Sequence, residues 1–279
     1  RAWLGWQGGA SHRRASENQS DFLTGGTATG RKLAATAAPM FKKLSLELGG
    51  KNPNVIFADC DFERMMNDTV RSSFANNGQI CLCGSRIYVE RPIYEEFRAE
   101  LVRRANNMKV GDPFSAETEL GALVSRQHQE KVLSYLDLAK EEGGTILCGG
   151  EPVILSGELA GGFYLSPAVV EGLGIECRTN QEEIFGPVVT IQPFDTEEEA
   201  IALANGVGYG LSSTVWTKDI SRASRVAERL QAGIVWVNCW MVRDLRTPFG
   251  GVKNSGVGRE GGTEALRFFT EAKNVCVKY

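Results

Sequence analysis

The sequence predicts an α/β protein built around a mostly parallel sheet. Short runs of β-branched and apolar residues alternate along the chain with helical patterns of about 10 to 18 residues, and Gly-rich turns join them. Strands that alternate with helices of this length are typical of βαβ units, which place the strands side by side in parallel. The composition, 42% hydrophobic and 23% charged over 279 residues, is that of a globular protein with a large buried core.

The first strand and helix are predicted at residues 54–57 and 61–77. Asp61 is a suitable N-cap for this helix, and the run Asn76-Asn77-Gly78 is a suitable stop. A second pair follows at residues 86–89 and 92–108, where Pro92 suits the first helical turn and apolar residues recur every four positions. These two pairs predict the first units of the parallel sheet.

The same alternation continues to the end of the chain. Further helices are predicted at residues 125–142, 196–205 and 220–231, and further strands at residues 145–148, 188–194, 213–216 and 234–237. The alternating pattern at residues 274–278 predicts one more strand, with an exposed edge that needs a partner. No periodicity is found in residues 1–20, and no structure is assigned to them.

The charge balance excludes several classes of partner. Lys and Arg number 31 against 34 Asp and Glu, a net charge of −3, so no net field favours nucleic acid or an anionic membrane surface. No apolar run approaches the roughly 18 residues of a membrane span, and the first twenty residues lack the apolar core of a signal peptide. The sequence therefore predicts a cytoplasmic protein that binds neither nucleic acid nor membrane.

The cysteines and histidines predict neither a disulfide framework nor a metal site. Seven cysteines are an odd number scattered over a long chain, so they are expected to be reduced thiols. There is no Cys-x-x-Cys pair, and His12 and His128 are the two histidines of the chain. Both histidines stand among hydrophilic residues and are predicted to be solvated surface side chains, which disfavours catalysis driven by histidine.

A glycine-rich segment stands at residues 23–30. Its Gly25-x-x-x-x-Gly30 spacing is that of a Walker A loop, but Arg31 and Lys32 occupy the positions where that loop needs Lys and then Ser or Thr. On spacing alone the segment predicts a turn that opens a helix. Such a turn either holds a phosphate on its free amides or is a plain tight turn.

Glu47 lies between two leucines in the segment L-E-L-G-G-K-N-P. Apolar surroundings disfavour the charged carboxylate and raise its pKa towards the range useful for acid or base catalysis. The alternative is a structural Glu paired with Lys51 or Lys43. From the residues alone, both interpretations stay open.

Cys81 follows the predicted helix stop in F-A-N-N-G-Q-I-C-L-C-G-S-R and precedes a strand. A loop of this kind can present a thiol to a cleft, and the backbone amide of the cysteine can help to hold an oxyanion. The nucleophile is the thiolate, so it needs a nearby base or positive charge, and Glu47 is a candidate for the base. The alternative is an inert buried thiol.

These segments together resemble the signatures of the NAD(P)-dependent aldehyde dehydrogenase superfamily. The segments around Glu47 and Cys81, E-E-I-F-G-P-V at residues 182–188 and P-F-G-G-V-K-N-S-G-V-G-R-E at residues 248–260 occur in the family's order, so the resemblance covers about residues 21–279. The resemblance implies that Cys81 forms a thiohemiacetal with an aldehyde and then a thioester. It also implies that Glu47 activates the water that hydrolyses this thioester. NAD is the implied cofactor, with NADP left open.

The resemblance also implies a set of cofactor-binding residues. Glu183 would hold the hydroxyls of the nicotinamide ribose, and Phe185 would pack near the nicotinamide. Thr24, Gly25 and Gly26 would lie by the pyrophosphate, although family members commonly have Ser where Gly26 stands. Leu48 and Gly49 complete the implied cofactor-binding set.

Within the superfamily, residues 235–251 are most similar to the 2-aminomuconate and 2-hydroxymuconate semialdehyde dehydrogenases. Their substrates carry a carboxylate at the end remote from the aldehyde. A guanidinium suits such a group because it pairs with a carboxylate through two parallel hydrogen bonds. The implied substrate-binding residues are Arg243 first, Arg246 second, and Phe249. The alternative for Arg243 is a surface side chain paired with Asp244.

The resemblance divides the chain into four segments and implies an N-terminal truncation. Residues 1–20 are unassigned, 21–49 are the end of a Rossmann-type nucleotide-binding domain, 50–249 are the catalytic domain, and 250–279 are a C-terminal tail that joins an oligomer sheet. We expect the complete protein to be a homo-oligomer and these 279 residues alone to bind cofactor negligibly. Two alternatives stay open: a non-catalytic relative that only oligomerises, and a cysteine thiol esterase.

Overall fold

The computed structural model describes residues 20–279, and these residues form two compact units. The larger unit is a single continuous stretch, residues 50–242, and the smaller unit joins residues 20–49 to residues 243–279. Cys81 and Glu183 therefore belong to the larger unit, and Glu47 and Arg243 to the smaller.

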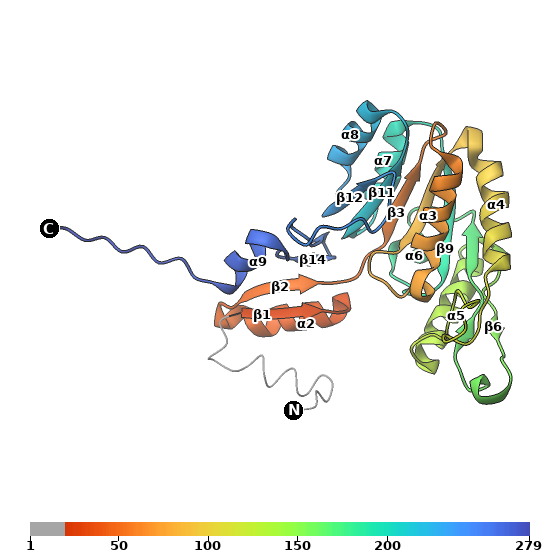
Figure 1. Ribbon diagram of the computed structural model, residues 1–279, viewed down its shortest axis with the longest axis horizontal. Coiled ribbons are helices and arrows are strands. Elements are labelled where there is room, and N and C mark those ends of the chain that lie inside the picture. Colours follow the sequence, from red (N-terminus) through yellow and green to blue (C-terminus); the bar gives the residue numbers. More distant parts are fainter. Residues whose placement is uncertain (1–19) are drawn as a thin grey trace. The chain divides into compact units, whose positions relative to one another are not determined.

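A seven-stranded sheet forms the centre of the larger unit. Its strand order is β12-β11-β3-β4-β9-β8-β5, and all neighbours are parallel except β5, which runs antiparallel to β8. The strands are β3 (Asn52–Ile56), β4 (Gly84–Glu90), β5 (Thr145–Cys148), β8 (Ala168–Glu171), β9 (Val188–Phe194), β11 (Ser212–Trp216) and β12 (Ile234–Val237). Figure 1 shows β3, β11 and β12 side by side with helices around them. The predicted α/β class is thus confirmed, with a mixed and mostly parallel sheet.

Helices cover both faces of this sheet. On one face, α3 (Phe62–Phe74) and α4 (Tyr94–Asn107) bury apolar side chains against Ile56 and Val89. On the other face, α7 (Glu197–Asn205) and α8 (Ile220–Arg229) pack on Val55 and Val215. Neighbouring residues such as Val55 and Ile56 enter different clusters because successive side chains of a strand point to opposite faces.

The remaining elements of the larger unit are shorter, apart from α5. Helix α5 (Arg126–Glu141) packs through Val132 and Leu136 against Ala168 and Val170 of β8. The short elements are α6 (Arg178–Gln181), the antiparallel pair β6 (Pro152–Val153) and β7 (Tyr164–Leu165), β10 (Tyr209–Gly210), and the 3-10 turns η2 (Ala75–Gly78), η3 (Arg91–Ile93) and η4 (Gly157–Leu159).

The helix starts follow local capping chemistry. Asp61 accepts a hydrogen bond from the Arg64 amide at 3.2 Å, which confirms it as the N-cap of α3. Ser125 and Thr196 cap α5 and α7 in the same way. The predicted helix at residues 61–77 nevertheless ends early, at Phe74, because the next residues turn into left-handed conformations.

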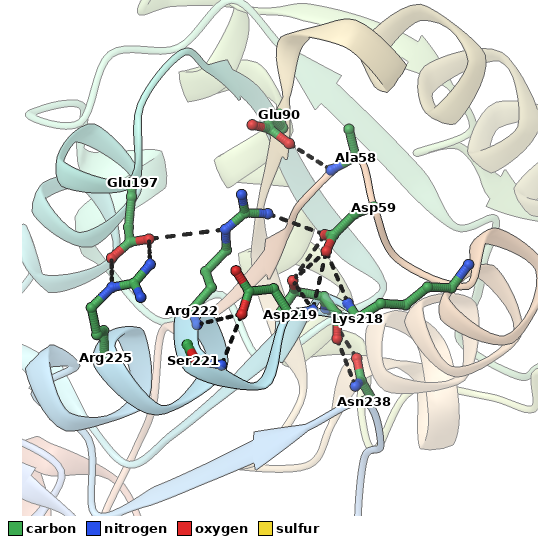
Figure 2. Close-up of polar contacts among 11 residues, drawn as sticks. Ala58, Asp59, Glu90, Glu197, Lys218, Asp219, Ser221, Arg222, Arg225 and Asn238 are labelled. Carbon is green, nitrogen blue, oxygen red and sulfur yellow. Dashed lines mark hydrogen bonds and ion pairs between the residues drawn. The ribbon is translucent and has the colours of Figure 1, made fainter.

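A polar cluster ties the end of β3 to the start of α8, as Figure 2 shows. The Asp59 carboxylate accepts hydrogen bonds from the Thr217 hydroxyl at 2.8 Å and from the Asp219 amide at 3.1 Å. Arg222 donates to the same carboxylate at 3.2 Å, and its guanidinium lies 4.6 Å from the centre of the Phe57 ring. Carboxylates stabilise helix N-termini because the first amides of a helix lack partners within it.

The smaller unit contains a three-stranded sheet with helices. Strand β1 (Ser20–Thr24) pairs in parallel with β2 (Lys43–Glu47), and β14 (Gly256–Val257) pairs antiparallel to β2. Between β1 and β2 lie α2 (Thr27–Ala37) and the 3-10 turn η1 (Ala38–Met40); the C-terminal part adds β13 (Val252–Lys253) and α9 (Gly262–Phe269). A Cβ on Gly30 of α2 would lie 2.6 Å from the Leu48 side chain, so helix and sheet approach closely there.

Several predictions differ from the structure. Residues 243–249, placed by sequence in the catalytic domain, group with the smaller unit. Residues 271–279 have no regular secondary structure in the single chain, and the strand predicted at 274–278, which needs a partner chain, stays a prediction. His12 lies outside the described residues. The functions assigned to the two parts stay predictions.

Residues 20–279 contain neither a membrane-spanning helix nor a cluster of metal-binding side chains. In this range no helix combines the length and apolarity needed to cross a bilayer. The same residues include no group of three or more His, Cys, Asp or Glu side chains arranged to hold a metal ion. None of the seven cysteines, which all lie within these residues, forms a disulfide.

Candidate active site

The loop that carries Cys81 begins with three consecutive left-handed residues. Asn76, Asn77 and Gly78 have φ angles of 51°, 57° and 68°. Asn tolerates this region better than most residues, and Gly adopts it without steric cost. The predicted helix stop is therefore confirmed, and it turns the chain abruptly from α3 towards Cys81.

Two buried side chains fix the three carbonyls of residues 81–83. The amide nitrogen of Asn52 donates to the Cys81 carbonyl at 2.7 Å and to the Cys83 carbonyl at 2.8 Å. The Trp240 indole donates to the Leu82 carbonyl at 3.0 Å. Neither residue was singled out from the sequence, although Asn52 stands within the segment quoted for Glu47. We call residues 76–83 the nucleophile loop, after the role predicted for Cys81. Partners from β3 and from the chain after β12 hold this loop.

The two neighbouring thiols have different surroundings. Cys81 is half-buried, whereas Cys83 is 6% exposed. Burial raises the pKa of Cys83 to about 12, so this thiol stays protonated at neutral pH. The structure therefore favours Cys81 over Cys83 as the reactive thiol.

Gly50 lies between the nucleophile loop and Glu183. Its amide donates to the Glu183 carboxylate (Oε1) at 2.9 Å, and a Cβ at this position would lie 2.6 Å from the Cys81 carbonyl oxygen. A side chain there would collide with the nucleophile loop. Gly50, Cys83, Glu183 and Phe185 also line one small cavity. The structure thus places the Cys81 backbone and the Glu183 carboxylate next to the same glycine, although the two residues are 102 positions apart in the sequence.

Burial changes the charge balance around Glu183. It raises the pKa of the Glu183 carboxyl, against the opposing effects of the Gly50 hydrogen bond and of the Lys131 and Lys51 charges. Lys51 is 1% exposed, and burial lowers its pKa to about 7. Within the described part of the chain, the Lys51 ammonium has no hydrogen-bond partner. No local pattern around Lys51 predicts that this side chain is buried.

His128 is not the solvated surface residue that the sequence predicted. It is half-buried, and its Nε2 lies 2.6 Å from the carbonyl oxygen of Phe185. The hydrophilic neighbours along the chain were misleading because only one side of α5 faces solvent. The partner of His128 lies 57 positions further along the chain.

Glu47 is buried at the end of β2 in the smaller unit. It is 4% exposed, and neither of its carboxyl oxygens has a hydrogen-bond partner among the described residues. Burial, assisted by the Glu260 charge, raises its pKa to about 7 against the opposing charges of Arg259 and Arg243. The alternative pairing with Lys43 is wrong, because Lys43 forms its ion pair with Glu271 at 2.7 Å.

The glycine-rich turn opens α2, as the sequence predicted. The Gly25 amide donates to the Glu47 carbonyl at 2.9 Å, directly after Thr24 ends β1. Gly26 is the N-cap of α2 and makes no side-chain cap; a Cβ there would meet no atom within 4 Å. The turn therefore has room at the start of α2 for the Ser found at this position in family members. Leu48 donates its amide to Ser255 at 2.9 Å, and Gly49 is the last residue of the smaller unit before Gly50.

The two candidate arginines for substrate binding lie in different surroundings. Arg246 forms a bidentate pair with Asp244, with its shortest contact at 2.5 Å. Arg243 instead lies over the Phe249 ring, 4.0 Å from its centre, and has no ion pair with any residue from 20 to 279. The alternative pairing with Asp244 thus applies to Arg246 and not to Arg243.

The chain belongs to the aldehyde dehydrogenase family, because residues 19–275 match the family model described as "Aldehyde dehydrogenase family". Among curated relatives, the 2-aminomuconic semialdehyde dehydrogenase of Danio rerio is 52% identical over 259 residues, covering 92% of this chain and 53% of that protein. The 2-hydroxymuconic semialdehyde dehydrogenase of a Pseudomonas species is 51% identical over 256 residues, with the same shares covered.

Solved structures match over a similar part of their chains. The HpcC protein of Thermus thermophilus superposes with a TM-score of 0.92 at 42% identity, covering 98% of this chain and 55% of that one. Betaine aldehyde dehydrogenase of Staphylococcus aureus, crystallised with NAD+, gives 0.89 at 42% identity and covers 92% and 51%. The chain therefore spans about half the length of the proteins it matches.

Proposed function

We propose that the complete protein oxidises an aldehyde to its acid with NAD+ through a thioester on Cys81. The observation that carries this proposal is the junction at Gly50, where a half-buried thiol loop meets a carboxylate held by a backbone amide. Aldehyde oxidation needs a nucleophile that binds the aldehyde and a group that holds the hydride acceptor, and Cys81 and Glu183 are the candidates for these two roles.

The residues present fit parts of a dinucleotide. The amide of Gly50 occupies one oxygen of Glu183, and the carboxylate has further acceptor capacity suited to ribose hydroxyls. At the start of α2, the unobstructed Gly26 position suits a phosphate, because helix N-termini offer free amides and a favourable dipole. When bound, NAD+ supplies a hydride acceptor.

Cys81 does the covalent chemistry in this proposal. Its thiolate forms a C–S bond to the aldehyde carbon, and the carbonyl oxygen takes up the negative charge, which the Cys81 backbone amide can stabilise. Loss of hydride from that carbon leaves a thioester. The fixed carbonyls of residues 81–83 keep the loop in one orientation through these steps.

Glu47 acts as the base in the second half of the reaction. It takes a proton from water, whose oxygen attacks the thioester carbon, and the C–S bond breaks to release the acid and the Cys81 thiolate. A carboxyl with a pKa of about 7 is matched to this task near neutral pH. Two residues, Leu48 and Gly49, separate Glu47 from Gly50 in the sequence.

The substrate class is a semialdehyde that carries a carboxylate. The names of the curated relatives support this choice, as does an Arg243 without an ion pair in the described chain. Arg243 would pair with the carboxylate, with Phe249 beneath the guanidinium, while Arg246 is already engaged by Asp244. The choice between NAD and NADP stays a prediction.

Self-association of the complete protein is part of the same proposal. Four apolar side chains of α9 and the C-terminal residues are 64–73% exposed, namely Leu266, Phe269, Val275 and Val277. Exposed apolar groups of this kind favour an interface. Sedimentation of the complete protein would test it, and a monomer at micromolar concentration would contradict it.

NADH formation tests the proposed reaction. The complete protein, with its full coding sequence, is mixed with NAD+ and 2-hydroxymuconic semialdehyde, and absorbance is followed. Cys81→Ser should abolish NADH formation, whereas Cys83→Ser, the matched control, should retain most of it. Absence of NADH with wild-type protein would refute the proposal; cofactor-free ester cleavage in its place would identify a thiol esterase.

Glu47→Gln tests the base. This variant should release a burst of about one equivalent of NADH and then stall, because hydride transfer precedes thioester hydrolysis. Mass spectrometry of the stalled protein should find the acyl group on Cys81. Steady turnover at the wild-type rate would rule out this role for Glu47.

Arg243→Ala tests the substrate class. The kcat/KM for the acidic semialdehyde should fall about 10- to 150-fold, the equivalent of a charge-assisted pair of about 1.5–3 kcal/mol, while a neutral aldehyde such as hexanal changes little. Arg246→Ala is the matched control and should leave both substrates unchanged. Equal losses on both substrates would show that Arg243 supports the fold instead.

A further inference from the structure

Helix α5 directs three polar side chains at the loop of residues 182–186. His128, Lys131 and Tyr135 are spaced three and four positions apart, so they share one face of the helix. Lys131 donates to the Glu183 carbonyl at 3.1 Å, and the Tyr135 hydroxyl donates to the Glu182 carboxylate at 2.6 Å. With the His128 contact to Phe185, α5 holds three of the four residues from 182 to 185.

The loop is also packed tightly from two sides. A Cβ on Gly186 would lie 2.6 Å from the Val132 side chain of α5. On the other side, a Cβ on Gly78 would lie 2.1 Å from the Gly186 carbonyl oxygen. The loop therefore packs closely against both α5 and the start of the nucleophile loop.

Phe185 has an unusual backbone conformation that His128 stabilises. Its φ angle is +61°, a region that costs a bulky non-glycine residue on the order of 1–3 kcal/mol unless its surroundings hold it there. The carbonyl of Phe185 accepts a hydrogen bond from His128 at 2.6 Å, and because a carbonyl can only accept, the proton is on Nε2. The two rings also meet edge to face, with centres 6.1 Å apart.

His128 is itself firmly placed. It lies in the first turn of α5, where its backbone amide donates to the Ser125 hydroxyl at 3.2 Å. Its ring therefore projects from a capped helix end and not from a loop. A donor on a rigid element can fix the orientation of a strained residue more closely than one on a flexible segment.

We propose that His128 is a positioning residue for the nicotinamide half of the cofactor. By bonding the Phe185 carbonyl, it holds Phe185 in its left-handed conformation and so sets the direction of the phenyl ring that packs near the nicotinamide. This inference rests on the proposed function, because it takes Phe185 to be a cofactor contact. It adds a residue that sequence analysis had assigned to the surface.

Steady-state kinetics of the complete protein test this role. His128→Leu removes the donor and should raise the KM for NAD+ about 3- to 10-fold, the range of one net hydrogen bond, and slow the NADH burst. Cofactor-free ester cleavage should stay at the wild-type rate, because it does not use Phe185. His128→Gln keeps an N–H donor and should restore the KM to within about twofold.

Gln129→Leu is the matched control. Gln129 is the next residue of α5, and its side chain donates to the Tyr164 carbonyl at 2.8 Å, outside the loop. This variant loses the same kind of hydrogen bond and should leave the KM for NAD+ unchanged. A wild-type KM in His128→Leu, a matching rise in Gln129→Leu, or a parallel fall in ester cleavage would each overturn the proposal.

Nuclear magnetic resonance gives a second readout without cofactor. The 279-residue chain has two histidines, so comparing nitrogen-15 spectra of this chain with and without His128→Gln assigns the His128 signals directly. The neutral ring should be the Nε2–H tautomer, and the Nδ1–H tautomer would overturn the inference.

If wild-type protein forms no NADH, the proposed function fails and the cofactor role of His128 fails with it. An active wild type with unaffected variants refutes His128 alone.

Discussion

Asn52 is the residue whose replacement should most directly loosen the nucleophile loop. It is 3% exposed, and its amide satisfies the carbonyls of Cys81 and Cys83 while its oxygen accepts from the Ser212 amide at 3.1 Å. Asn52→Ala leaves three backbone groups without a partner, at about 1–3 kcal/mol each. Because water can reach part of the opened loop, we expect the free energy of unfolding to fall by about 3–5 kcal/mol in urea titrations of the 279-residue chain.

The same change should expose a thiol that the wild-type loop protects. Cys83 reacts only when the loop opens. If Asn52→Ala lowers the free energy of that opening by about 2–3 kcal/mol, alkylation of Cys83 should be about 30- to 150-fold faster. Peptide mass spectrometry after timed iodoacetamide exposure measures the ratio of Cys83 to Cys81 labelling. That ratio should rise steeply in Asn52→Ala.

Asn54→Ala is the matched control for this experiment. Asn54 is a second buried Asn of β3 and bonds the hydroxyls of Thr69 at 2.9 Å and Thr214 at 2.6 Å. Hydroxyls can rotate to other partners, so its loss should cost less, about 1–3 kcal/mol, and leave the labelling ratio unchanged. If Cys83 stays protected in Asn52→Ala, or is exposed equally in Asn54→Ala, Asn52 does not hold the loop.

Three further predictions concern Lys51, Gly26 and Glu47. Between pH 7 and about 10.5 the Lys51 amine is protonated in the unfolded chain but mostly neutral in the folded chain, and this difference destabilises the fold. Lys51→Met removes that cost, so the free energy of unfolding should rise by on the order of 3–5 kcal/mol at pH 7 and by far less at about pH 10.5. Equal gains in urea titrations at both pH values would contradict this. Gly26→Ser should stabilise the chain by about a few tenths of a kcal/mol, since the hydroxyl can cap α2 in open space; a lower Tm would argue against it. In the complete protein, kcat should rise with pH through about 7 and then level off as Glu47 ionises, and a flat profile would exclude its role as base.

The sequence predicted most of the secondary structure because the signals are local. Strands at residues 145–148, 188–194 and 234–237 have the predicted bounds, since their β-branched runs end at turn residues. The helix cap at Asp61 and the left-handed turn at residues 76–78 are determined by the residue types at those positions and by partners only a few positions away. Even the raised pKa of Glu47 was predictable, from the leucines on either side of it.

Only the tertiary structure showed what fixes the site. Trp240 bonds the nucleophile loop across 158 positions and His128 meets Phe185 across 57, and no local pattern encodes such pairs. The sequence by itself determined the α/β elements, the motif residues and the family resemblance, because these depend on residue type and spacing. The fold decided that Cys83 is buried and that His128 is not on the surface, because burial and long-range hydrogen bonds depend on which distant segments pack together.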